Sequence, residues 1–116
     1  IVAAGGNAPK GVRPPGGKIN DASKAVLAKA GMPSIVWSVD TLDWKTRNAQ
    51  KTIDTVLSQV KDGDIVLMHD LYEQSAIAAE TLIPELTKRG YQLVTVSEMA
   101  ELRGGMAAGH SYGHFR

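Results

Sequence analysis

A strand–helix period constrains the fold of this chain more than any other feature. Three short apolar runs (34–39, 64–68 and 91–96) are read as strands, and helical patterns lie between them. From Val39 to Met68 is 29 residues, and from Met68 to Val96 is 28. Short strands alternating with amphipathic helices at this period are typical of βαβ units with parallel strands. The sequence therefore predicts an α/β fold, either a doubly wound sheet or part of a (β/α) barrel.

Capping residues and apolar periodicity place the helices. Asn20 is the expected N-cap of a helix that ends before Gly31, and Ser97 the expected N-cap of a short helix through Leu102. Pro84 is expected to kink the third helix. The predicted helices span 21–30, 48–61, 75–89 and 97–102, and 103–116 is predicted as an extended tail rich in Gly and Ala.

Composition excludes several classes of protein. The 116 residues carry 13 basic and 12 acidic side chains without a basic cluster, so nothing predicts a nucleic-acid binder. No apolar run approaches the roughly 18 residues of a membrane span. With no cysteine, the chain has neither disulfides nor thiolate metal sites. One domain with a modest core is expected.

His69 closes the most apolar of the three strands. The run Asp64-Ile-Val-Leu-Met-His-Asp70 delivers an imidazole to the carboxyl end of a buried strand, where α/β folds usually place their chemistry. Histidine titrates closest to neutral pH, which suits proton transfer. The structural alternative is that His69 only ends a strand and bonds to a loop.

Two further polar clusters stand at predicted strand ends. They are Arg13-Pro-Pro-Gly-Gly17 and Asp40-Thr-Leu-Asp-Trp44. Each has a structural explanation by itself, as a stiff loop and as a turn beside a core aromatic. Because parallel strands end at one edge of a sheet, the two clusters and Leu67-Met-His-Asp70 are expected on the same face.

The residue types in these clusters suit a hydrolytic site. Asp40 is predicted to accept a hydrogen bond from His69, fixing the tautomer and favouring the protonated ring as a general acid. Arg13 is a fixed cation suited to holding a carboxylate. Gly16 offers the first free backbone N–H after two prolines and can approach an oxyanion closely. Trp44 and Leu67 would form an apolar wall.

These three clusters, in this order and spacing, resemble the last three of five motifs of the NodB-homology polysaccharide deacetylases, the fourth carbohydrate esterase family. The resemblance covers nearly the whole chain, including Gly90-Tyr-Gln-Leu-Val-Thr-Val-Ser-Glu98. It implies the C-terminal portion of a distorted (β/α) barrel over residues 1–102, with 103–116 as a tail. It also implies metal-dependent removal of acetyl groups from a polysaccharide such as peptidoglycan, chitin or acetylated xylan.

The resemblance assigns a role to each cluster. Arg13 would hold the base aspartate, and Gly16 would donate to the oxyanion. Asp40 would tune His69, which would protonate the leaving group, and Trp44 and Leu67 would line the acetyl pocket. Gly16 departs from the family, which often has an aromatic residue there, so a side-chain contact with substrate is lost while the backbone donor stays.

The family's first two motifs, an Asp-Asp pair and a His-x-x-x-His pair, do not precede Arg13 in this chain. The base and the ligands of a divalent metal, expected to be zinc, would therefore lie on a missing N-terminal half, which would be a partner of this chain. We expect the chain alone to be inactive, and the complete protein to be secreted or at a bacterial cell surface. A half barrel exposes sheet edges, so a stable monomer is not expected.

His110 and His114 have the spacing of the family's metal motif, and histidines four apart on a helix can share a metal. Because they follow the last predicted helix and a Gly104-Gly105 break, a role in the tail is favoured, and a metal role is the alternative.

Two other functions compete with the deacetylase. A catalytically silent carbohydrate-binding or scaffold relative would keep the family core and lose the metal half. A flavodoxin-like regulatory domain would use Asp40 and Asp70 as acidic strand-end residues, but it leaves Arg13 and Trp44 without a role.

Overall fold

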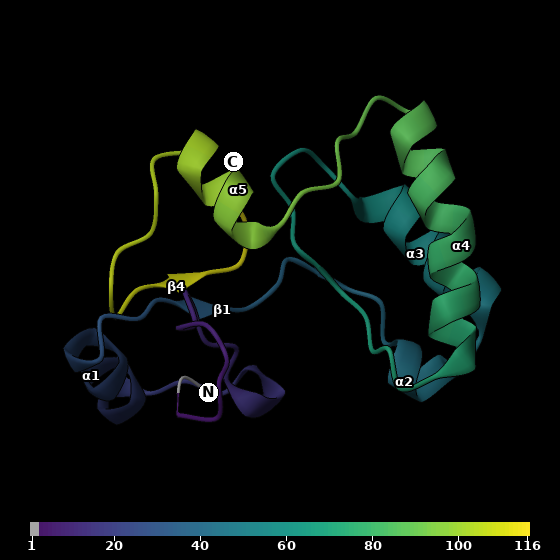
Figure 1. Cartoon of the computed structure of the whole chain (residues 1–116). Coiled ribbons are helices and arrows are strands. Elements are labelled where there is room, and N and C mark those ends of the chain that lie inside the picture. The colour runs from purple at the N-terminus through teal and green to yellow at the C-terminus, as the bar shows by residue number, and fades with distance from the viewer. Residues whose placement is uncertain (1–2) are drawn as a thin grey trace.

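The computed structural model describes residues 3–116 and has α/β architecture with parallel strands (Figure 1). Helices α3 and α4 lie side by side on one side of the molecule, and α1 and α5 lie on the other. The elements are a 3-10 turn Pro15–Gly17, α1 Asp21–Lys29, β1 Ser34–Ile35, β2 Val39–Asp40, α2 Asp43–Thr46, α3 Ala49–Gln59, β3 Val66–Leu67, α4 Glu73–Lys88, α5 Val96–Leu102 and β4 Ser111–Tyr112.

The helix predictions are confirmed within one or two residues at most ends. Asn20 and Asn48 cap α1 and α3 by accepting the N–H of Ser23 and of Lys51. Helix α4 runs through Pro84. The predicted cap Ser97 is wrong: the N-cap of α5 is Thr95, two residues earlier, which forms a capping box with Glu98.

The predicted strand 34–39 is divided into two because its bonding partner changes along its length. β1 pairs in parallel with β4, and β2 pairs in parallel with β3. Between them, Val36 donates to the carbonyl of Tyr112, whereas Ser38 donates to the carbonyl of Ile65. The segment 103–116, predicted as an extended tail, therefore contributes a strand.

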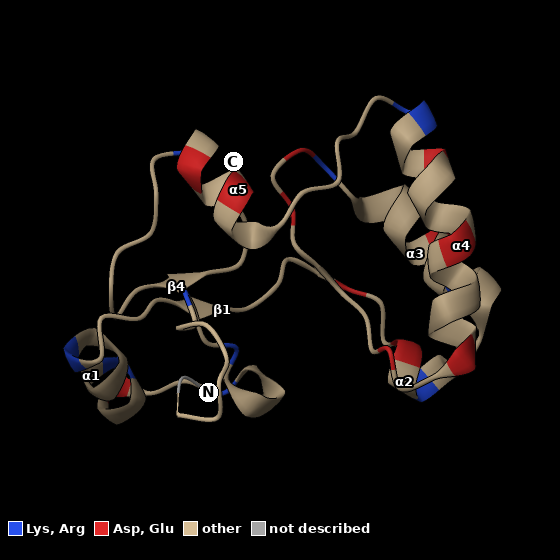
Figure 2. Cartoon of the chain, in the orientation of Figure 1, with Lys and Arg blue, Asp and Glu red and all other residues tan. Residues whose placement is uncertain are grey.

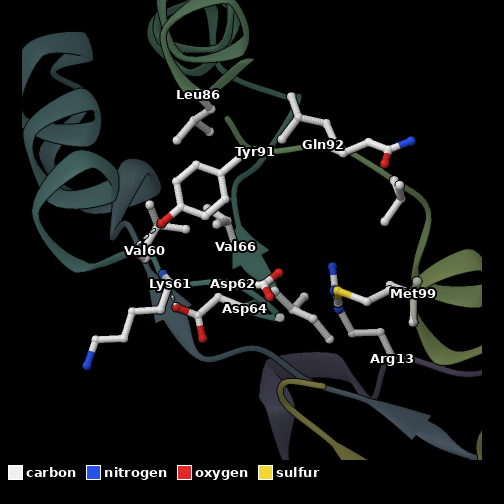
Figure 3. A pocket seen from close by; sticks show the side chains of 15 residues that line it. Arg13, Val60, Lys61, Asp62, Asp64, Val66, Leu86, Tyr91, Gln92 and Met99 are labelled. Carbon is white, nitrogen blue, oxygen red and sulfur yellow. Dashed lines mark hydrogen bonds between the residues drawn. The ribbon is translucent and has the colours of Figure 1, made fainter. Parts of the chain in front are cut away.

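The predicted strand 91–96 is not a strand in the structure. Tyr91 bonds back to helix α4 through its N–H, but no backbone N–H of Gln92, Leu93 or Val94 donates a hydrogen bond within residues 3–116. A cavity of about 300 Å³ separates this segment from β3 (Figure 3). Residues 91–95 therefore lack the hydrogen-bonded neighbour that would make them a strand.

Two apolar cores hold the molecule together. The first lies between α3 and α4 and is built from Ile53, Val56, Ala78, Leu82 and Leu86. The second joins β1, the residue before β3, α5 and the C-terminal segment through Ile35, Ile65, Ala100 and Phe115. β3 lies between the two cores, so it is the element that positions both sides of the molecule.

The C-terminal segment closes the second core. Phe115 is 5% exposed, and its N–H donates to the carbonyl of Gly63 at 2.7 Å. Arg116 pairs with Asp64, and Arg103 bonds to both the Phe115 carbonyl and Asp62. The last residues therefore tie the loop that enters β3 to α5.

Charges of both signs are spread over the elements (Figure 2). Helix α4 begins with Glu73 and ends with Lys88, as the helix dipole favours. None of the helices in residues 3–116 combines the length and the apolar character needed to cross a bilayer.

Gly63 tests the contact with the C-terminal segment. Its φ is +86°, and a Cβ there would overlap the carbonyl of Phe115. We expect Gly63→Ala to lower the free energy of unfolding by more than the roughly 1–2 kcal/mol that a left-handed residue costs. Gly90→Ala is the control, because φ is +94° there with no atom within 4 Å. Equal losses in urea denaturation would contradict the close contact.

Asp64 makes folding pH-dependent. Burial raises the pKa of Asp64, but hydrogen bonds from Arg116, the Lys61 N–H and Ser38 lower it more, so it lies below its usual value. A lowered folded pKa gives stability that is present above the unfolded pKa of about 3.9 and is lost as pH falls through the folded value. In urea denaturation between pH 3 and 7, we expect Asp64→Asn to flatten the acid loss of stability. The exposed Asp62→Asn should keep it, and identical profiles for both variants would contradict the prediction.

Candidate active site

His69 lies two residues after the end of β3 and is held by Asp43, the first residue of α2. Its Nδ1 lies 2.7 Å from Asp43 Oδ1, and its backbone N–H donates to Asp43 Oδ2 at 2.6 Å. Because a carboxylate only accepts, Nδ1 carries the proton in this pair. No hydrogen bond within residues 3–116 uses Nε2, and the His69 side chain is 40% exposed. The ring is thus fixed at one nitrogen and available at the other.

The Asp43 carboxylate is buried and fully bonded. Besides the two donors of His69, Oδ1 accepts the Trp44 N–H at 3.0 Å, and Oδ2 accepts the Ser75 hydroxyl at 2.6 Å. Burial raises the pKa of Asp43, but the hydrogen bonds from Ser75 and His69 and the charge of His69 outweigh it and hold the pKa below its usual range. Asp43 is therefore a carboxylate at neutral pH, suited to stabilising a protonated imidazole.

The partner of His69 is Asp43, so the prediction that Asp40 accepts this hydrogen bond is wrong. Asp40 Oδ1 instead accepts the N–H of Leu42 at 3.0 Å. Leu42 has φ +52° and ψ 32°, a left-handed conformation that is uncommon for a residue with a side chain. The chain reverses at Leu42 and brings Asp43 back to the end of β3. Asp40 shapes this turn, and Asp43 meets the histidine.

Trp44 and Leu67 lie close to this pair in the chain. Leu67 is buried in β3, and its carbonyl accepts the Thr41 hydroxyl at 2.8 Å. Trp44 follows Asp43 and is 47% exposed, so it is not a core aromatic. Tyr72, which sequence reasoning missed, places its ring edge-on 6.4 Å from the His69 ring, with Arg47 stacked 4.8 Å from the Tyr72 centroid.

Arg13 and Gly16 are not bonded to the histidine pair in the structure. The exposed Arg13 borders the cavity between β3 and the segment 91–96, together with Ile65, Val96 and Met99 (Figure 3). Gly16 has φ +66°, and no hydrogen bond among the described residues uses its N–H. The donor predicted at Gly16 is thus unpaired, while the partner predicted for Arg13 is not in this part of the chain.

The described residues contain no group of three His, Asp or Glu side chains that would hold a metal. His110 and His114 lie on either side of strand β4, so they do not have the helical spacing at which two histidines share an ion. Residues 3–116 therefore do not provide a site for the metal that the family resemblance implies.

Comparison with known proteins supports the family resemblance. No protein-family model matches the sequence. The peptidoglycan-N-acetylmuramic acid deacetylase PdaC of Bacillus subtilis is 45% identical over 103 residues, which are 89% of this chain and 21% of that protein. Its solved structure superposes with a TM-score of 0.77 over 83% of this chain and 46% of that chain. The chain belongs to the fourth carbohydrate esterase family.

Two solved members of the family extend the comparison. The family 4 acetyl xylan esterase from Clostridium thermocellum, solved with a cobalt ion, has a TM-score of 0.82, 25% identity and coverage of 93% of this chain and 54% of that chain. A family 4 pseudoenzyme from Bacillus anthracis has a TM-score of 0.74, 28% identity and coverage of 89% and 36%. The (β/α)-barrel fold class is thereby confirmed, and the chain spans about half or less of each of these relatives.

Exchanging each aspartate for asparagine tests which one is structurally required. In Asp43→Asn, the new NH₂ group replaces an oxygen that accepts two of the four donors, so we expect a loss of about 1–3 kcal/mol in the free energy of unfolding. Asp40→Asn keeps an oxygen for Leu42 and should stay within about 0.5 kcal/mol of the parent. Urea denaturation of both variants decides, and the reverse order would refute the assignment of Asp43.

Proposed function

We propose that this chain is the C-terminal part of a metal-dependent polysaccharide deacetylase that hydrolyses acetyl groups from a glycan. The observation that carries the proposal is the His69–Asp43 pair, in which a buried carboxylate fixes Nδ1 and leaves Nε2 free at the end of a strand. The sequence similarity to PdaC supports an N-acetylated sugar of peptidoglycan as the substrate class, with chitin-type glycans and acetylated xylan as the other family substrates.

His69 acts as the general acid in this proposal. When protonated, Nε2–H gives its proton to the leaving nitrogen or oxygen as the bond from the carbonyl carbon to that atom breaks. Asp43 stabilises the imidazolium and keeps the ring in one orientation, because its own charge persists at neutral pH. The neutral ring then regains a proton from solvent.

The other predicted residues bind and orient the substrate. The unpaired N–H of Gly16 suits donation to the carbonyl oxygen as it gains negative charge. Trp44 and Leu67 line a pocket for the acetyl methyl, and Arg13 holds the carboxylate of the catalytic base. These roles come from the family resemblance, and the exposure of Trp44 and Arg13 is compatible with them.

The base and the ligands of a divalent metal, with zinc as the expected ion, belong in this proposal to an N-terminal half of the same domain. Two features support such a partner. The cavity beside β3 is bordered by Gln92, Leu93 and Val94, whose N–H groups have no partner among residues 3–116. Leu93 is also 50% exposed. A glycan of the cell wall as substrate further implies a secreted or cell-surface protein.

A catalytically silent relative is the second candidate. The similarity to a family 4 pseudoenzyme keeps it in consideration, because the fold alone does not fix activity. An upstream half without the Asp-Asp and His-x-x-x-His residues would favour a carbohydrate-binding or scaffold role.

Replacing His69 in the full protein tests the proposal. We expect His69→Ala to lower deacetylation turnover by about 10²–10⁴-fold, because proton transfer to the leaving group is lost. Metal content, measured by mass spectrometry, should not change, because His69 is not a ligand. His110→Ala is the control, and it should keep turnover within a few fold. Turnover of His69→Ala within a few fold of the parent would exclude His69 as the acid.

A further inference from the structure

Among residues 3–116, Ser75 is the one side chain bonded to the His69–Asp43 pair that the family resemblance does not assign. It is 3% exposed and lies in the first turn of α4, with its hydroxyl 2.6 Å from Asp43 Oδ2. Asp43 itself is 2% exposed. Because a carboxylate only accepts, the buried Ser75 hydroxyl donates its proton to Asp43 in this pair.

The position of Ser75 in its helix makes this contact specific. The N-cap of α4, Tyr72, makes no side-chain capping bond, so the helix begins without a local cap. Ser75 is the third residue of α4, and its hydroxyl bonds to a residue 32 positions earlier in the chain. The positive end of α4 and the Asp43 carboxylate therefore meet through Ser75.

The bonding of Asp43 shows what this hydroxyl does to the pair. Oδ2 accepts only from Ser75 and the His69 N–H, while Oδ1 accepts from the His69 ring and the Trp44 N–H. Removing Ser75 leaves Oδ2 with one donor, so the carboxylate is freer to rotate and binds a proton more readily. Both changes weaken the hold of the carboxylate on the imidazole, because Asp43 Oδ1 accepts the hydrogen bond from His69 Nδ1.

We infer that Ser75 is a positioning residue for the general acid. Its hydroxyl holds the Asp43 carboxylate against α4, so that His69 keeps one orientation toward the substrate. The inference rests on the proposed function for its catalytic meaning. The geometry of the pair itself does not depend on that function, so the two are tested separately.

Ser75→Ala in the full protein is the test, observed by NMR with labelled histidine and aspartate. We expect the His69 Nδ1–H signal to exchange with water about tenfold faster, because the acceptor is less restrained. We expect the Asp43 carboxyl to titrate about 0.5–1 pH unit higher, because a hydrogen bond to its charged form is lost. Signals are assigned by their loss in His69→Gln and Asp43→Asn.

Ser23→Ala is the matched control, because Ser23 is the third residue of α1 and its hydroxyl makes no hydrogen bond within residues 3–116. It should change neither signal. Ser75→Thr keeps the hydroxyl and should retain both parent values. If Ser75→Ala does not fold, Ser75→Cys carries the test with a weaker donor and should give an intermediate shift.

Two results would overturn the inference: parent-like values for both signals in Ser75→Ala, or the same changes in Ser23→Ala. In the active protein, the expected companion is a kcat about tenfold lower with KM within twofold, because substrate contacts are not touched. NMR changes as expected in a protein without deacetylase activity would support the role of Ser75 and count against the proposed function alone.

Discussion

The candidate site depends on one buried carboxylate that accepts four hydrogen bonds. Asp43 receives donors from its own helix α2, from His69 two residues after β3, and from the first turn of α4. Since a buried charge is costly unless it is bonded, these three elements are stable together only in an arrangement that satisfies it. The same hydrogen bonds lower the pKa of Asp43, so the carboxylate whose bonding folding requires is also the one that holds the His69 ring.

This arrangement explains why the turn before α2 has an uncommon backbone. Leu42 and Arg47, on either side of α2, are the only residues with side chains that adopt positive φ in the described part of the chain. Asp40 stabilises the first of them by accepting the Leu42 N–H. Strained residues persist where the surrounding contacts determine them, and here the contacts are those of Asp43. The two aspartates of Asp40-Thr-Leu-Asp43 thus have different tasks, one in the backbone and one in the chemistry.

The sequence predicts helices better than strands because helix ends are local. Asn20 and Asn48 bond within three residues of their own position, so their patterns suffice. The sequence also allows Thr95 to be predicted as an N-cap, because Glu98 stands three residues after it and can complete a capping box. Ser97 has no such partner. The strands depend on neighbours that are distant in sequence. In the predicted strand 34–39, Val36 donates to the Tyr112 carbonyl, whereas Ser38 donates to the Ile65 carbonyl. Which aspartate meets His69 depends on the left-handed conformation of Leu42. A leucine in the sequence does not predict that conformation, so Asp43 could not be preferred to Asp40.

The unpaired edge and the incomplete chemistry have a common explanation in the proposed N-terminal half. Residues 91–94 border the cavity beside β3 and form no strand, and Arg13, which borders the same cavity, has no ion pair among residues 3–116. In the proposed function, a chain that supplies the base aspartate for Arg13 would approach this cavity, because Arg13 borders it. The N-terminal half would then supply both the missing strand beside β3 and the base aspartate for Arg13 through one contact. On this account β3, which carries His69 at its end, is the element through which the two halves of the site are brought into register.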